Sequence, residues 1–123
     1  MPEPAALPAS IAASDADLFG PLEPTGPRAG ADRGTPMTAT RVLHDDGPLQ
    51  VGIWECTPGG WSIERRTNTE TVHILAGRGR ITDADGTAHE LAPGVAMVLP
   101  RGWSGRWDIT ETLRKLYVTL EAE

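Results

Sequence analysis

The chain has 123 residues and a net charge of −6, because 11 Lys and Arg stand against 17 Asp and Glu. This length accommodates one domain, and so acidic a surface repels polyphosphate, which excludes nucleic acid as an expected partner. The single cysteine, Cys56, excludes an intramolecular disulfide and a cysteine-rich zinc module. No apolar run approaches the ~18 residues of a membrane span, and the N-terminal segment lacks the basic start of a secretory signal. We therefore expect a soluble, cytoplasmic protein with no membrane partner.

Residues 1–36 are predicted to form an irregular arm rich in Pro and Ala. Seven of the 11 prolines fall in this segment, and proline lacks a backbone N–H and blocks helices and central strands. We expect the first ~15 residues to be disordered. Leu18, Phe19 and Leu22 form an apolar cluster that Gly20-Pro21 interrupts, so these three residues are not expected to form one face of a helix. Two interpretations stay open: the cluster holds the arm against a partner surface, or the arm is an unstructured tail.

Residues 37–123 are predicted to form a single all-β domain. Short runs rich in Val, Ile, Thr, Leu and Trp alternate with turn signals, and Asp85-Gly86 favours a hairpin because Gly adopts the positive φ of tight turns. Glu111–Leu120 is the only segment whose pattern also allows a helix in place of a strand. About nine strands at such spacing indicate a sandwich or a small barrel. The predicted strands are Thr38–His44, Leu49–Cys56, Trp61–Arg66, Thr69–Ala76, Gly79–Asp83, Ala88–Leu91, Val95–Leu99, Trp103–Ile109 and Leu113–Leu120.

Two of these segments, Val72–Leu75 and Val95–Leu99, are largely apolar on both faces. A small domain buries only ~60–70% of the surface that its unfolded chain exposes, so such strands require a second buried surface. Packing of two copies sheet against sheet would provide it. We therefore predict a homodimer.

Seven short segments spread over residues 37–120 resemble the cupin superfamily. They are Val51–Gly59, Glu70–Gly77, Asp85-Gly86, Pro93-Gly94, Pro100-Arg101-Gly102, Gly105-Arg106-Trp107 and Glu111–Lys115. More narrowly, the chain is similar to small single-domain cupins related to ureidoglycine aminohydrolase and to ethanolamine-utilisation cupins. This resemblance implies a conical jelly-roll barrel with a pocket at its wider mouth, commonly dimeric. It implies less about activity, because one fold hosts many functions.

The resemblance also raises the question of a metal. Metal-binding cupins place His-x-His before a Glu and a Gly on one strand, and a further His follows Pro-x-Gly-x-x. Here Glu70 and Gly77 match, but the His-x-His positions fall on Glu64 and Arg66, or on Ile63 and Arg65, and the last ligand position is Gly105. A guanidinium cannot deprotonate to coordinate a metal, and its charge disfavours a divalent cation. We expect no cofactor, with a divalent metal as the alternative.

His73 is the remaining candidate metal ligand near Glu70. It lies three residues after Glu70, so on a regular strand the two side chains face opposite sides, and only a bulge would bring them together. The other two histidines, His44 and His89, have polar neighbours and are expected on the surface.

In the family orientation, Glu70 points into the barrel, where a carboxylate must be paired, neutralised or hydrated. Arg66 or Arg65 is its expected partner, because a guanidinium binds a carboxylate through two parallel hydrogen bonds. Two interpretations stay open. The pair is an internal ion pair that replaces the metal, or Arg66 binds an anionic ligand beside Glu64 while Glu70 acts as hydrogen-bond acceptor or general base.

Tryptophan is the other signal of a ligand site. Trp103, Gly105 and Trp107 share one face of their predicted strand, so both indoles are expected to border a space at Gly105 that suits a planar or apolar molecule. The alternative is that the rings fill the core. Trp61 and Trp54 are further candidates, facing either the lumen or a dimer surface.

These patterns predict a metal-free cupin that binds a small organic molecule, anionic or aromatic, in its lumen. The alternative is an enzyme (an isomerase, cyclase, lyase or aminohydrolase-like protein) that uses Glu70 as its acid or base, with or without a divalent metal. A purely structural dimer module is a further hypothesis. Cys56 is interpreted as a packing thiol, because its strand reads as buried and no His is nearby in the sequence.

Overall fold

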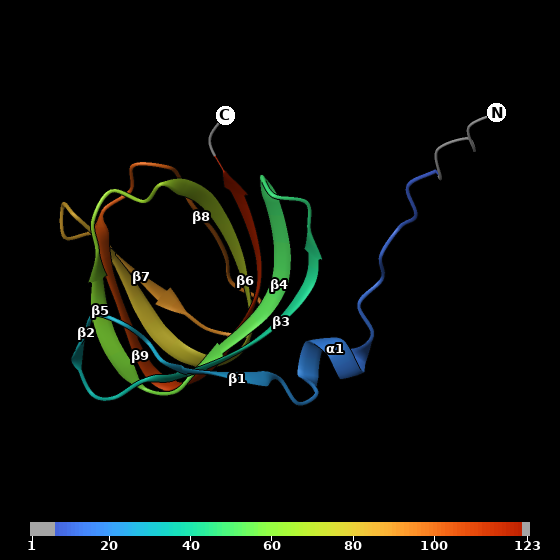
Figure 1. Ribbon diagram of the computed structural model, residues 1–123. Helices are drawn as coiled ribbons and strands as arrows, with labels where there is room; N and C mark the ends of the chain where they lie inside the picture. Colours follow the sequence, from blue (N-terminus) through green and yellow to red (C-terminus); the bar gives the residue numbers. More distant parts are fainter. Residues whose placement is uncertain (1–6, 122–123) are drawn as a thin grey trace.

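The computed structural model describes residues 7–121, which form a strongly curved antiparallel sheet closed into a barrel (Figure 1). The all-β prediction is confirmed, and no helix in the described residues is long and apolar enough to cross a membrane. The elements are α1 (Asp15–Phe19), β1 (Glu23–Pro27), β2 (Ala31–Arg33), β3 (Met37–Asp45), β4 (Leu49–Cys56), β5 (Gly59–Ile63), β6 (Asn68–Asp83), β7 (Ala88–Leu91), β8 (Ala96–Leu99) and β9 (Gly105–Glu121).

The long strand β9 organises the barrel because it pairs with three other strands. Its first part pairs with β5, its last part pairs with β4, and almost its whole length pairs with β6. The registers Trp61↔Trp107 and Val72↔Tyr117 bring inward-facing residues of distant segments together. The chemistry of the interior therefore depends on the alternation of side chains along β6 and β9.

Four predicted strands are in fact two. Each of β6 and β9 is one continuous strand where the sequence predicted two. At the predicted interruption the pairing of β6 with β9 contains bulges, with register shifts at Ile74/Ala76, Ala76/Arg78 and Arg78/Gly79. Gly77 has a φ of 92°, and a Cβ there would collide with the carbonyl of Thr112. Bulges bend a strand without ending its pairing, which is why glycine-rich sequence here curves the sheet. The segment Glu111–Leu120, for which the sequence also allowed a helix, belongs to the strand β9.

The N-terminal arm is more ordered than predicted. Its residues 7–14 have no regular secondary structure, but α1 follows with a capping box between Ser14 and Asp17. The strands β1 and β2 then pair with β3 and β5. Proline is compatible with β1 because this strand lies at an edge and contains a bulge next to Pro24. The prediction of disorder falls partly on residues 1–6, which lie outside the described residues.

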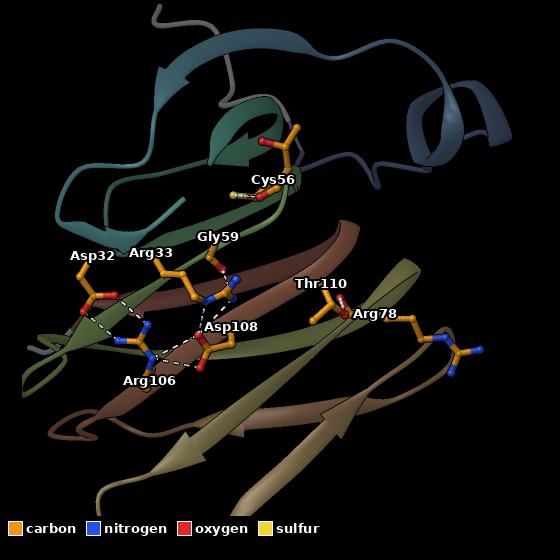
Figure 2. A network of polar contacts seen from close by, with 9 residues as sticks. Asp32, Arg33, Cys56, Gly59, Arg78, Arg106, Asp108 and Thr110 are labelled. Atoms are coloured by element: carbon orange, nitrogen blue, oxygen red, sulfur yellow. Dashed lines mark hydrogen bonds and ion pairs between the residues drawn. The ribbon is translucent and has the colours of Figure 1, made fainter. Parts of the chain in front are cut away.

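Ion pairs fix the second half of the arm to the barrel (Figure 2). Asp32 receives two hydrogen bonds from the guanidinium of Arg106, at 2.7 and 2.8 Å. Arg106 also donates to Asp108 at 3.0 Å, and Arg33 donates to both Asp108 and the carbonyl of Gly59. The strand β2 is thereby connected to β5 and β9, and the arm adds one strand at each end of the sheet, β1 beside β3 and β2 beside β5.

The barrel interior is packed with apolar side chains over much of its length. Ten buried residues form a single cluster. The cluster consists of Cys56, Trp61, Val72, Ile74, Ile81, Leu91, Leu99, Trp107, Ile109 and Leu113.

Candidate functional site

A cavity of about 330 Å³ opens into the barrel interior. This volume is at the lower end of the range for small-molecule sites. Its walls come from β3, β4, β5, β6 and β9 and from the arm, and they are mixed in character, with aromatic rings beside charged groups. The lining residues are Arg28, Thr40, Gln50, Trp54, Trp61, Ile63, Arg66, Glu70, Trp107, Lys115, Tyr117 and Thr119.

Strand alternation puts the two central charged groups inside. Glu70 shares its face of β6 with the buried Val72, and Lys115 shares its face of β9 with the buried Leu113 and Tyr117. Glu70 is 5% exposed and Lys115 is 6% exposed. The Lys115 Nζ donates to Glu70 Oε2 at 2.9 Å. The expected inward orientation of Glu70 is confirmed, and its nearest partner is a lysine that the sequence did not single out.

Arg66 is the second partner of Glu70. Its Nη1 lies 3.4 Å from Glu70 Oε1, and its Nη2 donates to Asn68 at 2.7 Å. The open choice between two arginines is thereby settled. Arg65 is exposed with a φ of 47°, because β5 ends at Ile63 and alternation no longer holds beyond it.

Three tryptophans pack together in the cavity, and two of them, Trp54 and Trp107, contact the Lys115 ammonium. Trp61 and Trp107 are stacked, with centroids 6.0 Å apart, and Trp54 meets both edge-on. The Lys115 Nζ lies 4.4 Å from the Trp54 centroid and 4.5 Å from that of Trp107. These are cation–π distances. The same rings that make the cavity apolar therefore also hold its central cation.

Burial and neighbouring charges shift the protonation equilibria in the cavity. Burial lowers the pKa of Lys115 below its ordinary value, and the cations Arg66 and Arg28 lower it further, although Glu70 opposes both effects. Burial likewise raises the pKa of Tyr117. The phenol of Tyr117 therefore stays protonated and donates to Gln50 at 2.7 Å.

The arm contributes a third cation. Arg28, between β1 and β2, lines the cavity, and its guanidinium carbon lies 4.9 Å from the centroid of Trp61. The cavity thus contains three cationic side chains, Arg28, Arg66 and Lys115, against one carboxylate, Glu70. Two buried donors on its lining residues, Trp61 Nε1 and Arg66 Nε, have no hydrogen-bond partner within the described part of the chain.

Two predicted site residues lie elsewhere. Glu64 is exposed, because it follows the end of β5. Trp103 precedes β9, so strand alternation does not apply to it, and its indole donates to Asp83 at 2.9 Å instead of lining the cavity. A Cβ at Gly105 would collide with the Trp103 ring. The space expected at Gly105 is therefore occupied by Trp103 itself.

The other predicted site residues do lie together. Trp54, Trp61, Trp107, Arg66 and Glu70 all line the cavity. Sequence reasoning missed the remaining polar lining residues. The sequence did contain a signal for Lys115 and Tyr117. They lie two and four residues after the apolar Leu113, so on a regular strand all three side chains share one face. The polar lining residues that were not predicted are Arg28, Thr40, Gln50, Lys115, Tyr117 and Thr119.

The residues in the cavity do not fit a divalent metal. Both carboxylate oxygens of Glu70 face cations, and the neighbouring nitrogen groups are an ammonium and a guanidinium, which are hydrogen-bond donors rather than ligands. Across residues 7–121, no three His, Cys, Asp or Glu side chains gather as a metal site would require. His73 is exposed on the outer face of β6, opposite to Glu70, as the three-residue spacing predicts.

Cys56 is wholly buried in the apolar cluster. Burial raises the pKa of its thiol to about 11, which suppresses the nucleophilic thiolate. Both observations agree with the interpretation of Cys56 as a packing residue.

The family comparison matches residues 43–117 to the EutQ-like cupin domain. The chain belongs to this cupin family. The fold is therefore a cupin jelly-roll barrel, as the resemblance implied. No curated protein is similar enough to count as a match.

Several solved structures are similar to this chain in fold. A protein of unknown function from Pseudomonas syringae pv. tomato superposes with a TM-score of 0.76 at 21% identity, over 84% of this chain and 46% of its own. The chain thus spans less than half of that relative. The EutQ protein of Clostridium difficile gives a TM-score of 0.61 at 20% identity, over 72% and 71% of the two chains. A predicted oxalate decarboxylase from Thermotoga maritima gives 0.64 at 16% identity, over 82% and 94%.

Proposed function

We propose that this cupin binds a small organic anion in the lumen of its barrel, without a metal. The observation that carries the proposal is the charge of the cavity, in which Arg28, Arg66 and Lys115 face the single carboxylate of Glu70. Uncompensated positive charge in a largely buried site is costly. A bound anion would compensate it.

The hydrogen-bonding and apolar features of the cavity support the same ligand class. The unpartnered donors Trp61 Nε1 and Arg66 Nε require acceptors, which a carboxylate supplies. The stacked indoles of Trp61 and Trp107 offer flat apolar walls to the rest of the molecule. A carboxylate with a short apolar or planar body therefore matches the cavity best.

Binding is measurable through tryptophan fluorescence, since three of the four tryptophans line the cavity. A panel of small aliphatic and aromatic carboxylates should change the emission in a saturable way. Arg66→Met should weaken the affinity about 10- to 100-fold, which corresponds to the ~1.5–3 kcal/mol of a charged hydrogen bond. Arg101→Met, at an exposed position, is the matched control and should bind like the native protein. Equal binding by both variants would contradict the proposal.

An enzyme that uses Glu70 as its acid or base is a second candidate function. The buried 2.9 Å contact between Lys115 and Glu70 favours it, because a carboxylate hydrogen-bonded to an ammonium in a cavity is placed for proton transfer. The test is exchange of carbon-bound hydrogen in deuterated water, followed by NMR for each carboxylate that binds. Exchange that is lost in Glu70→Gln, with binding retained, would establish this role. Unchanged exchange in Glu70→Gln would remove Glu70 from the mechanism.

A further inference from the structure

The single lysine of this chain is the cation at the centre of the cavity. The sequence contains ten arginines and one lysine, Lys115. Every ion pair outside the cavity that the described residues form uses arginine or histidine. Arginine and lysine differ chemically in one decisive respect, because an amine releases its proton readily when buried and a guanidinium does not.

The surroundings of Lys115 match those of a nucleophilic amine. Its Nζ lines the cavity and hydrogen-bonds one acceptor, Glu70, which can take up its proton. Burial and the nearby cations Arg66 and Arg28 favour the neutral amine. Lysines that form covalent bonds to carbonyl substrates are activated in this way, by desolvation or by another cation.

We propose that Lys115 forms an imine with a small carboxylate that also bears an aldehyde or ketone group, such as a 2-oxo acid. The inference rests on the proposed function, since it adds covalent capture to the binding of an organic anion. In this arrangement Arg28 and Arg66 bind the carboxylate of the ligand, and its carbonyl carbon faces the Nζ. The indoles cover the rest of the molecule.

The step balances without any further reactant. Glu70 takes one proton from the Lys115 ammonium, and the resulting amine attacks the carbonyl carbon, so a C–N bond forms. The oxygen takes one proton from the attacking nitrogen, which gives a neutral carbinolamine. Glu70 then returns its proton to this hydroxyl, which departs as water. The product is a protonated imine plus water, and nothing is oxidised or reduced. The positive charge stays on nitrogen, beside the Glu70 carboxylate and between the rings of Trp54 and Trp107.

Reductive trapping tests this proposal. The native protein is incubated with glyoxylate, pyruvate or phenylpyruvate in the presence of cyanoborohydride, and its intact mass is measured. Lactate and phenyllactate, which lack the carbonyl, serve as matched probes. We expect one reduced adduct with at least one of the 2-oxo acids and none with the hydroxy acids. Peptide mapping should place the adduct on Lys115, the one lysine in this sequence.

Variants separate the covalent step from binding. Lys115→Arg keeps a cation beside Glu70 but removes the amine, so the adduct at this position should be lost, and Lys115→Met is a second variant should the first fail to fold. Glu70→Gln should slow trapping, because no carboxylate accepts the proton.

Three outcomes are distinguishable. Saturable binding of 2-oxo and hydroxy acids with an adduct on Lys115 supports both proposals. Binding of both classes without an adduct on Lys115 overturns the imine and leaves the proposed function standing. Neither binding nor trapping overturns both. Because the adduct is mapped in the native protein, the outcome does not depend on the folding of any variant.

Discussion

Glu70 is the residue on which the polar half of the cavity depends. It pairs with two cations, whereas Lys115 has one carboxylate partner. Removal of one member of a buried ion pair costs about 3–5 kcal/mol, because the other charge is left uncompensated. Loss of Glu70 should therefore destabilise the fold more than loss of Lys115.

We predict that Glu70→Gln lowers the free energy of unfolding more than Lys115→Met does. The first substitution leaves Lys115 and Arg66 without a carboxylate, at a cost of about 3–5 kcal/mol. The second leaves Glu70 still paired with Arg66, so its cost should be smaller. Urea unfolding of both variants and of the double variant measures the difference and the coupling. Equal losses, or a larger loss in Lys115→Met, would show that Arg66 contributes nothing to the pairing.

Cys56 provides a second prediction, on pH. Its folded-state pKa of about 11 lies above the ordinary value of 9.0, so the folded protein binds the thiol proton more tightly than the unfolded chain. Stability from this group is intact below pH 9 and is lost as pH rises from 9 towards 11. The native protein should lose about 2–3 kcal/mol more than Cys56→Ala over this window, at 1.36 kcal/mol per pKa unit. If the free energy of unfolding changed equally with pH in the native protein and in Cys56→Ala, the raised pKa of the Cys56 thiol would be contradicted.

Alternation along strands made some of the site predictable from the sequence, and its failures have identifiable causes. Trp107 and Trp61 lie inside because they belong to regular strands, and Lys115 follows the same rule. Trp103 does not, because β9 begins two residues later. Arg28 could not be predicted from periodicity at all, since it lies in an irregular turn and only the docking of the arm brings it to the cavity.

At the scale of the element, the arm is the part of the fold that the sequence concealed. Its prolines suggested irregularity, yet short edge strands tolerate proline, and three arginines of the barrel bind the arm. Arg114 donates to the carbonyls of Leu18 and Gly20. Arg41 pairs with Asp17, and Arg106 pairs with Asp32. The pairing partners are far apart in sequence, which is why composition alone did not reveal them.

We predict that Arg106→Gln loosens the arm without unfolding the barrel. The substitution removes the paired contact to Asp32 and the link to Asp108, at a cost of about 1 kcal/mol for partly exposed pairs. Hydrogen–deuterium exchange should rise in β2 and remain unchanged in the centre of β6. Arg80→Gln, which removes an exposed pair with Glu90, is the control and should leave β2 unchanged. The same exchange in both variants would mean that the network does not hold the arm.

The long strands show a related limit of local sequence signals. Glycine and polar residues in the middle of β6 suggested two strands, but they produce bulges in one ladder. A local signal of interruption cannot distinguish a chain reversal from a bend, because both use glycine at positive φ. The pairing of β6 with β9 along almost their full lengths shows that the glycines bend one strand rather than reverse the chain. That pairing is a property of the tertiary structure.

At the scale of the whole molecule, the outer face of β6, β8 and β9 carries apolar side chains that no other part of the described chain covers. It forms a shallow apolar groove in which Val98 is 60% exposed. Farther along the same sheet, Ile11 and Ala13 of the arm line a second such groove with Leu116. The groove residues are Thr71, Val72, His73, Ala96, Met97, Val98, Leu116 and Val118.

The final prediction is that this groove is the homodimer contact. Both copies would present the same self-complementary face, as a twofold interface requires, and stable interfaces of this kind bury about 1,600 Å² in total. Light scattering of the native protein should give twice the chain mass. Val98→Glu places a charge in the middle of the apolar face and should give a monomer that still folds, whereas Ala88→Glu, on the exposed β7, should stay dimeric. A native protein that runs as one chain, or a Val98→Glu variant that stays dimeric, would refute this assignment, because a carboxylate buried without a partner costs more than the contact around it contributes.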